Sequence, residues 1–180
     1  MLELRIHGLG GQGVVTMSEI LALACYESGR EVQVFPWFGP ERTGAPVTGF
    51  IRLDDRLIRL RSQIYRPDII IVTDTKVLNK INVTEGAKPT TSLLIAGSLS
   101  PTEIIKSLNL KKENIIGYDT STVVTDQRLA NSALLGFAAK TLHLTSLANC
   151  LKAVKIKLRD KDASIIKANL EAVTKGYAHK

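Results

Sequence analysis

A glycine-rich stretch near the start of the 180-residue chain offers the clearest chemistry in the sequence. Residues 7–14 read HGLGGQGV and place glycines at 8, 10 and 13, the spacing of a dinucleotide-binding loop. In such a loop the first glycine permits a tight bend, the second lets the backbone approach a phosphate, and the third lets helix and strand pack closely. Exposed N–H groups and the helix dipole then favour an anion. The stretch predicts a phosphate or anion site, with a plain tight turn as the alternative.

The residues beyond the loop favour a ligand with an extra phosphate over NAD. An NAD site needs an Asp or Glu at the end of the second strand, about 20 residues after the loop. Residues 35–37 read FPW and offer no carboxylate, while Glu41 is followed directly by Arg42. That cation suits a further phosphate, which coenzyme A and NADPH both carry. Gln12 has two interpretations, as a donor to a ligand oxygen or as a cap of the following helix.

The elements that must position this loop alternate between strand and helix. Apolar and charged residues alternate over 2–7, and apolar residues at helical spacing over 14–28 end at Gly29. With a strand over 32–35, this order predicts a βαβ unit with a right-handed crossover. Residues 68–74, DIIIVTD, are typical of a strand buried on both faces of a parallel sheet, with its carboxyl end at a ligand crevice.

The rest of the chain continues the α/β pattern. We expect strands over 47–53 and 56–60, joined as a hairpin at 54–55, further strands over 92–96 and 114–118, a short helix from Pro101, and helices over 127–143, 146–157 and 164–177. The predicted fold is α/β: a Rossmann-like three-layer open sheet, mostly parallel, with a hairpin insertion and C-terminal helices. No linker or repeat is evident, so residues 1–180 are expected to form a single domain.

Composition excludes several classes of protein. The formal charge of +7 suits an anionic ligand or an acidic partner, but aromatic residues make up only 5% and no nucleic-acid-binding motif occurs. Cys25 and Cys150 lack metal-ligand spacing and are expected to be buried hydrophobes. We expect no signal peptide, no membrane span and a soluble cytoplasmic protein. His7 and His143 have no identifiable carboxylate or serine partner, so neither receives a catalytic role.

Two segments taken together resemble a known family. Residues 7–14 and residues 38–47, FGPERTGAPV, are similar to the signature segments of the gamma subunit of 2-oxoacid:ferredoxin oxidoreductases. Residues 128–136, RLANSALLG, and 169–177, NLEAVTKGY, agree with the same family, so the match runs the length of the chain in order. The resemblance implies an oxidoreductase of the pyruvate synthase type, acting on pyruvate or also on 2-ketoisovalerate. It would convert 2-oxoacid, CoA and oxidised ferredoxin to acyl-CoA, CO2 and reduced ferredoxin.

The resemblance also implies a division of labour among chains. Alpha, beta and delta type subunits would be the partners, and thiamine diphosphate, Mg²⁺ and iron–sulfur clusters would lie in them. The present sequence has no ferredoxin-type run of four cysteines. Its own task would be to hold CoA near the thiamine site, with no catalytic residue and no metal ligand. The CoA-binding residues implied are Gly10, Gly11, Gln12, Gly13, Arg42, Thr43, Asn131 and Lys140, although relatives often carry a further cation or glycine at position 43.

Alternatives stay open at the level of the residues themselves. The same loop with Arg42 fits a free-standing NADP-binding oxidoreductase or regulatory module, and the loop also fits an assembly scaffold that contacts a partner. Asn131 has a plain explanation as a helix cap or surface residue. Arg56, Arg59 and Arg61 are explained either as exposed strand charges or as a docking surface for an acidic partner.

Overall fold

A computed structural model of the chain describes residues 1–38, 44–97 and 114–179. Six strands form one sheet in the order β2-β3-β1-β4-β5-β6. The strands are β1 (Leu2–Leu9), β2 (Glu31–Phe38), β3 (Pro46–Asp54), β4 (Ile69–Val72), β5 (Ser92–Ala96) and β6 (Ile115–Tyr118). The helices are α1 (Val14–Tyr26), α3 (Ala130–Thr141), α4 (Leu147–Lys157) and α5 (Ala163–Ala178), with short 3₁₀ helices η1 (Thr75–Asn79), η3 (Thr120–Thr122) and η4 (Gln127–Leu129). The helix expected from Pro101 lies outside the described residues.

The sheet is mixed, with a parallel half and an antiparallel half. Strands β1, β4, β5 and β6 run parallel, whereas β3 pairs antiparallel with both β1 and β2. Strands β1 and β2 therefore point the same way with β3 inserted between them. The mostly parallel α/β fold, the strand–loop–helix–strand opening and the buried strand at residues 69–72 are confirmed.

The predicted strand over residues 56–60 is wrong, and with it the hairpin at 54–55. Strand β3 forms its antiparallel pairs with β2 and β1, so both of its edges are occupied and none is left for a third partner. The segment is instead tied to the sheet by side chains, because Gln33 Nε2 donates to the Leu60 carbonyl at 2.6 Å and Arg52 Nη2 donates to the Gln63 carbonyl at 3.2 Å. The three arginines in this stretch, Arg56, Arg59 and Arg61, are exposed.

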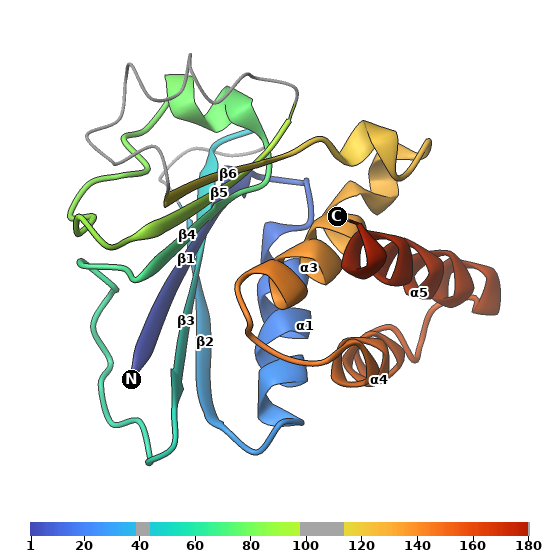
Figure 1. Cartoon of the computed structure of the whole chain (residues 1–180), viewed down its shortest axis with the longest axis horizontal. Coiled ribbons are helices and arrows are strands. Elements are labelled where there is room, and N and C mark those ends of the chain that lie inside the picture. Colours follow the sequence, from blue (N-terminus) through green and yellow to red (C-terminus); the bar gives the residue numbers. More distant parts are fainter. Residues whose placement is uncertain (39–43, 98–113, 180) are drawn as a thin grey trace.

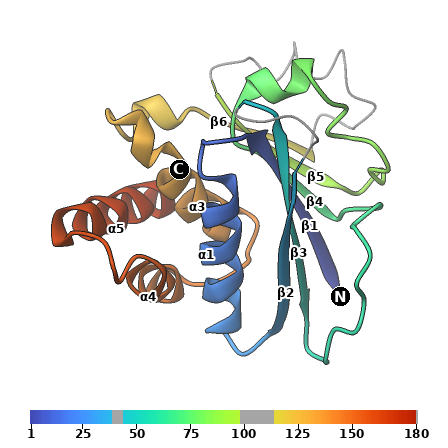
Figure 2. The same cartoon turned by 180° about the vertical axis from the view of Figure 1, so that it is seen from behind.

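Figures 1 and 2 show helices α1, α3, α4 and α5 on one side of the sheet. The alternation of β1 explains this layer: Leu4 and Ile6 are fully buried in the core that these helices share with the sheet. A smaller core on the other side joins β4 and β5 to η1 through residues such as Ile70, Val77 and Leu93. Within the part of the chain that the structure describes, no helix is long and apolar enough to cross a membrane.

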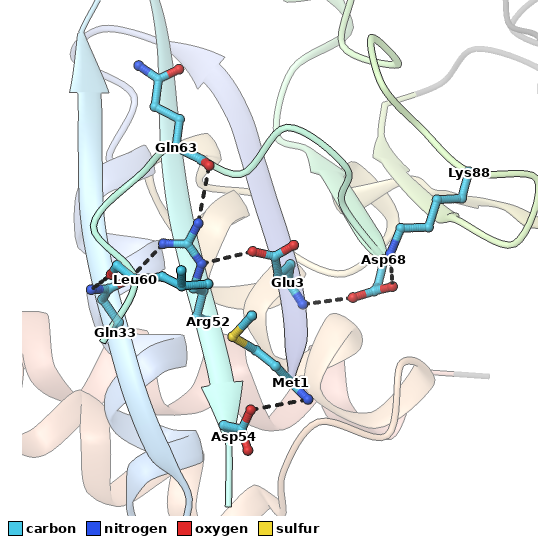
Figure 3. A network of polar contacts seen from close by, with 9 residues as sticks. All are labelled: Met1, Glu3, Gln33, Arg52, Asp54, Leu60, Gln63, Asp68 and Lys88. Atoms are coloured by element: carbon cyan, nitrogen blue, oxygen red, sulfur yellow. Dashed lines mark hydrogen bonds and ion pairs between the residues drawn. The ribbon is translucent and has the colours of Figure 1, made fainter. Parts of the chain in front are cut away.

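A polar network secures the amino-terminal end of the sheet (Figure 3). Arg52 on β3 is only 1% exposed, and its guanidinium donates to Glu3 Oε1 on β1 and to Gln33 Oε1 on β2, both at 2.8 Å. The Glu3 backbone N–H donates to Asp68 Oδ2 at 2.9 Å, and Lys88 pairs with the same carboxylate at 2.6 Å. Because the buried cation has a carboxylate and two further acceptors, its desolvation is compensated and strands β1, β2 and β3 are held in register.

Candidate anion site at the glycine loop

The glycine loop lies at the carboxyl edge of the parallel strands. A cavity of about 690 Å³ opens there, lined by residues that follow β1, β4, β5 and β6 and by the start of α3. Its lining includes Gly11, Gln12, Gly13, Thr73, Asp74, Thr75, Lys76, Gly97, Thr120, Arg128 and Asn131. In the sheet, β2 and β3 lie on one side of β1 and β4, β5 and β6 lie on its other side. The cavity is therefore at β1, where the direction of the strand order reverses. Open α/β sheets bind their ligands at this point.

The glycines of the loop have different roles from those expected by position. A side chain at Gly8, still inside β1, would lie 2.1 Å from Thr73 Oγ1 and 2.6 Å from Val14 Cγ2, so this first glycine provides the close packing of strand and helix. Gly11 and Gly13 adopt positive φ angles of 87° and 79°, so they make the turn. The predicted assignment of the bend to the first glycine and the packing to the third is wrong, because β1 extends two residues into the motif.

Gln12 is engaged within the protein at both ends of its side chain. Its Oε1 accepts from the Leu9 backbone N–H at 3.1 Å, and its Nε2 donates to Asp74 Oδ2 at 2.7 Å. Helix α1 has no side-chain cap at Gly13, so Gln12 does not cap the helix. The side chain instead joins the loop after β1 to the loop after β4, and its second amide hydrogen stays available.

Asn131 closes the loop from the helical side. Its Nδ2 donates to the Gln12 carbonyl at 2.6 Å, which joins the first turn of α3 to the loop across 119 residues of sequence. A Cβ at Gly13 would meet the Asn131 amide at an ordinary contact distance of 3.7 Å, so it is the positive φ of 79° that favours glycine here. The structure therefore brings Gly11, Gln12, Gly13 and Asn131 together at one cavity, whereas Gly10 is not among its lining residues.

The other predicted contacts have different outcomes. Arg42 and Thr43 lie outside the described residues, but Gly10 N–H donates to the carbonyl of Ala45 at 2.8 Å, so the chain just after them lies against the loop. Lys140 does not line the cavity. It is at the opposite end of α3, roughly 14 Å along the axis from Asn131 at 1.5 Å per residue, and its Nζ donates to the His179 carbonyl at 3.3 Å.

The electrostatics of the cavity suit an anion. Among the described residues, the N–H groups of Gly11 and Gly13 donate to no protein acceptor, and they precede the positive end of α1. Lys76 and Arg128 contribute cations, and Asp74 contributes one carboxylate. The Arg128 guanidinium pairs with Asp126 at 2.7 Å, and that hydrogen bond lowers the pKa of the Asp126 carboxyl.

Sequence reasoning placed the carboxyl end of residues 68–74 at a crevice but did not name Thr73, Asp74 and Lys76, which line the cavity, as site residues. The available signal was the strand 69–72 itself, because the residues that follow a buried parallel strand fall at the ligand edge. Asp74 uses Oδ2 for Gln12 and Oδ1 for the Lys76 backbone N–H at 2.8 Å. Its carboxylate thus orients the loop, and it also brings one negative charge to the wall of the cavity.

The titratable groups offer no nucleophile or metal site. Cys25 and Cys150 are both fully buried, and burial raises their thiol pKa values to about 12 and about 11, so they carry no thiolate at neutral pH. Burial also lowers the pKa of His7 to about 3, with the Arg5 charge as a smaller cause. In the described ranges no cluster of three His, Cys, Asp or Glu residues is arranged to hold a metal.

An open α/β sheet with a glycine turn and a polar cavity at its carboxyl edge defines a Rossmann-like chain. Residues 3–179 match the model of the pyruvate ferredoxin/flavodoxin oxidoreductase family. The chain belongs to that family. Over 158 residues it is 39% identical to the pyruvate/ketoisovalerate oxidoreductases common subunit gamma of Thermococcus kodakarensis, covering 86% of this chain and 85% of that one. The pyruvate synthase subunit PorC of Methanocaldococcus jannaschii is 37% identical, with 98% and 99% covered.

Solved structures agree with this assignment. Pyruvate oxidoreductase subunit PORC of Thermotoga maritima superposes with a TM-score of 0.80 at 27% identity, covering 98% of this chain and 94% of that one. The 2-oxoglutarate:ferredoxin oxidoreductase of Magnetococcus marinus, solved with 2-oxoglutarate, coenzyme A and succinyl-CoA bound, shares the fold with a TM-score of 0.73 at 22% identity. This chain covers 30% of that longer one. The chain is thus a gamma-type subunit of an oxidoreductase in this family.

Proposed function

We propose that this chain positions coenzyme A for acyl transfer in a pyruvate or 2-ketoisovalerate:ferredoxin oxidoreductase. Alpha, beta and delta type subunits would complete the enzyme and ferredoxin would accept the electrons. Thiamine diphosphate with Mg²⁺, held by partner subunits, would supply decarboxylation, and their iron–sulfur clusters would carry the electrons away. The observation that carries the proposal is the cavity at the carboxyl edge, where two N–H groups of the glycine turn without a described acceptor meet Lys76 and the Asp126-paired Arg128.

The residues of this chain would act by binding and orientation. The N–H groups of Gly11 and Gly13 can donate to phosphate oxygens, and Lys76 can neutralise part of their charge. Asn131 holds the loop carbonyl at 2.6 Å and so keeps these donors pointing in one direction. Holding the CoA thiol in one position removes translational and rotational freedom before the reaction, which is the contribution that a chain without a catalytic residue can make.

The topology weighs against a dinucleotide in the same loop. In a Rossmann domain the strand beside β1 ends at the acidic residue that binds the ribose. Here the neighbour of β1 on that side is the antiparallel β3, and β2 with its FPW end lies one strand further away. The position of the ribose carboxylate is thereby removed, which favours CoA over the NADP alternative.

The test is a CoA titration of the reconstituted complex. Lys76→Met and Arg42→Ala should each raise the KM for CoA in pyruvate-dependent viologen reduction about tenfold, with a smaller effect on kcat. Lys161→Met, an exposed lysine away from the cavity, serves as the matched control and should leave the KM for CoA unchanged. Gel filtration of each complex should show normal assembly.

Three results would contradict the proposal. The first is an unchanged KM for CoA in both cavity variants, and the second is viologen reduction by the isolated chain. The third is full CoA-dependent activity in a complex that lacks this chain. Loss of assembly in Arg42→Ala, with a normal KM for CoA in whatever complex remains, would support the scaffold alternative instead.

A further inference from the structure

A second, larger cavity opens on the face of the sheet that is opposite to the α-helices. Its volume is about 1120 Å³, and its walls come from β1, β2, β3 and the segments 63–66 and 80–86. We call it the open-face cavity. It is lined by Arg5, His7, Trp37, Ala45, Pro46, Thr48, Phe50, Gln63, Ile64, Tyr65, Arg66, Lys80, Ile81, Asn82, Glu85 and Gly86. Figures 1 and 2 place helices α1, α3, α4 and α5 on the other side of the sheet.

The floor of the open-face cavity presents a hydrogen-bond donor without an acceptor. His7 is 5% exposed, its Nδ1 lies 3.1 Å from Thr48 Oγ1, and its buried Nε2 has no partner among the described residues. The Thr48 hydroxyl has no other described acceptor, so donating its hydrogen to Nδ1 satisfies it. That arrangement places the imidazole hydrogen on Nε2 and makes it a buried donor in a residue that lines the cavity.

Arg5 adds a second donor and a positive charge. Its Nη2 donates to the carbonyls of Val83 and Glu85 at 3.0 and 2.6 Å, while its buried Nε has no partner in the described part of the chain. Arg5 and His7 are two residues apart on β1, so both side chains point to the same face. A buried donor without an acceptor is costly. The Arg5 charge adds to the positive field of the cavity that this residue lines.

The rim of the open-face cavity is aromatic and basic. Trp37 is 55% exposed and Tyr65 is 67% exposed, which is a large apolar area for two aromatic residues at one cavity. Arg66 and Lys80 add two cations, and Glu85 is the one carboxylate among the described residues of the lining. Exposed aromatic residues and arginines around a pocket are typical of the centres of protein interfaces. The volume also exceeds the usual range for small-molecule pockets.

We propose that the open-face cavity is the docking site for a partner subunit, which inserts an Asp or Glu side chain flanked by apolar residues. The acidic side chain lies beside Arg66 and Lys80, and the flanking residues pack on Trp37 and Tyr65. Charge complementarity selects an acidic segment, because the described residues of the lining carry three cations, Arg5, Arg66 and Lys80, against one carboxylate. The proposal does not depend on where CoA binds, since the glycine loop lines a different cavity.

Trp37 allows a direct test, because it is the single tryptophan of the chain. The chain is labelled with 5-fluorotryptophan and mixed with its unlabelled partner subunits, so that one ¹⁹F resonance reports the rim. Assembly should shift this resonance and abolish its H₂O/D₂O solvent effect. Tyr65→Ala and Lys80→Glu should each weaken assembly about tenfold or more, measured by interferometry on the immobilised chain.

Controls separate docking from folding. Tyr26→Ala removes an equally exposed tyrosine from the end of α1, on the helical side, and should leave assembly unchanged. Replacing Tyr65 with p-benzoylphenylalanine should cross-link this chain to a partner peptide that contains Asp or Glu. The proposal is overturned if Trp37 keeps its solvent effect in the assembled complex. It is also overturned if cross-links reach only a second copy of this chain, or if citrate shifts the ¹⁹F resonance saturably while partner subunits do not.

Discussion

Acidification should destabilise the chain through one residue, His7. Burial holds its folded-state pKa at about 3, whereas a histidine in the unfolded chain has a pKa of about 6.5. Between these two values the unfolded chain binds a proton that the folded chain does not, so stability falls as the pH falls. The contribution is fully present above the unfolded pKa and is lost progressively below it.

The size of this effect follows from the two pKa values. Well below pH 6.5 the loss approaches about 1.4 kcal/mol per pH unit, and it amounts to about 2 kcal/mol between pH 7 and pH 5. Its upper bound, near pH 3, is about 5 kcal/mol. The cause is structural, because His7 is 5% exposed on β1 and the Arg5 charge lies on the same face.

The measurement is urea unfolding of wild type and His7→Asn at pH 7, 6 and 5. The Asn side chain can still accept from the Thr48 hydroxyl but cannot take up a proton, so its free energy of unfolding should fall about 2 kcal/mol less over this range. His143→Asn is the control, because it removes a histidine outside the sheet and Asn tolerates the positive φ of 52° at that position. This variant should lose as much free energy of unfolding between pH 7 and pH 5 as the wild type does. An equal fall in the free energy of unfolding from pH 7 to pH 5 for wild type and His7→Asn would refute the reasoning.

Three further changes test the packing and the site. Gly176→Ala should lower the free energy of unfolding by about 2 kcal/mol or more, because its Cβ would lie 1.9 Å from the Ala133 carbonyl oxygen where α5 crosses α3. Thermal or urea unfolding measures this, and an unchanged free energy of unfolding would show that α3 and α5 can move apart at no cost. Arg52→Met should lower the free energy of unfolding by about 3 kcal/mol, because the Glu3 carboxylate would lose its partner at 2.8 Å. In the double variant, adding Glu3→Gln should restore less than half of that loss. Asn131→Ala removes one exposed hydrogen bond of 2.6 Å to the loop, so it should raise the KM for CoA of the complex about fivefold. The melting temperature should stay within about 2–3 °C of wild type. An unchanged KM for CoA would place the ligand elsewhere.

Local patterns were sufficient for much of the fold. The apolar run at residues 69–72 is buried at every position, and the helices expected over 14–28, 127–143, 146–157 and 164–177 all occur with small differences at their ends. These predictions depend on periodicity, which reports how neighbouring residues face a core. The strand predicted over 56–60 failed because periodicity does not show whether a sheet edge is free.

The glycine motif shows the same limit at the level of the site. Its spacing and its place between strand and helix were enough to predict a turn at an anion site. Which glycine bends and which one packs depended on how far β1 extends, and hence on pairing with β3.

The sequence by itself determined the family, the alternation of strand and helix, and the glycine loop, because each is written in residues close together along the chain. The tertiary structure alone decided that Asn131 meets the Gln12 carbonyl, that Asp74 orients the loop, and that Lys140 lies at the far end of α3. It also brought His7, Arg5 and Trp37 together at the open-face cavity. These contacts join residues that are distant in sequence, and they exist only after β3 has been inserted beside β1 and the helices have packed on one face.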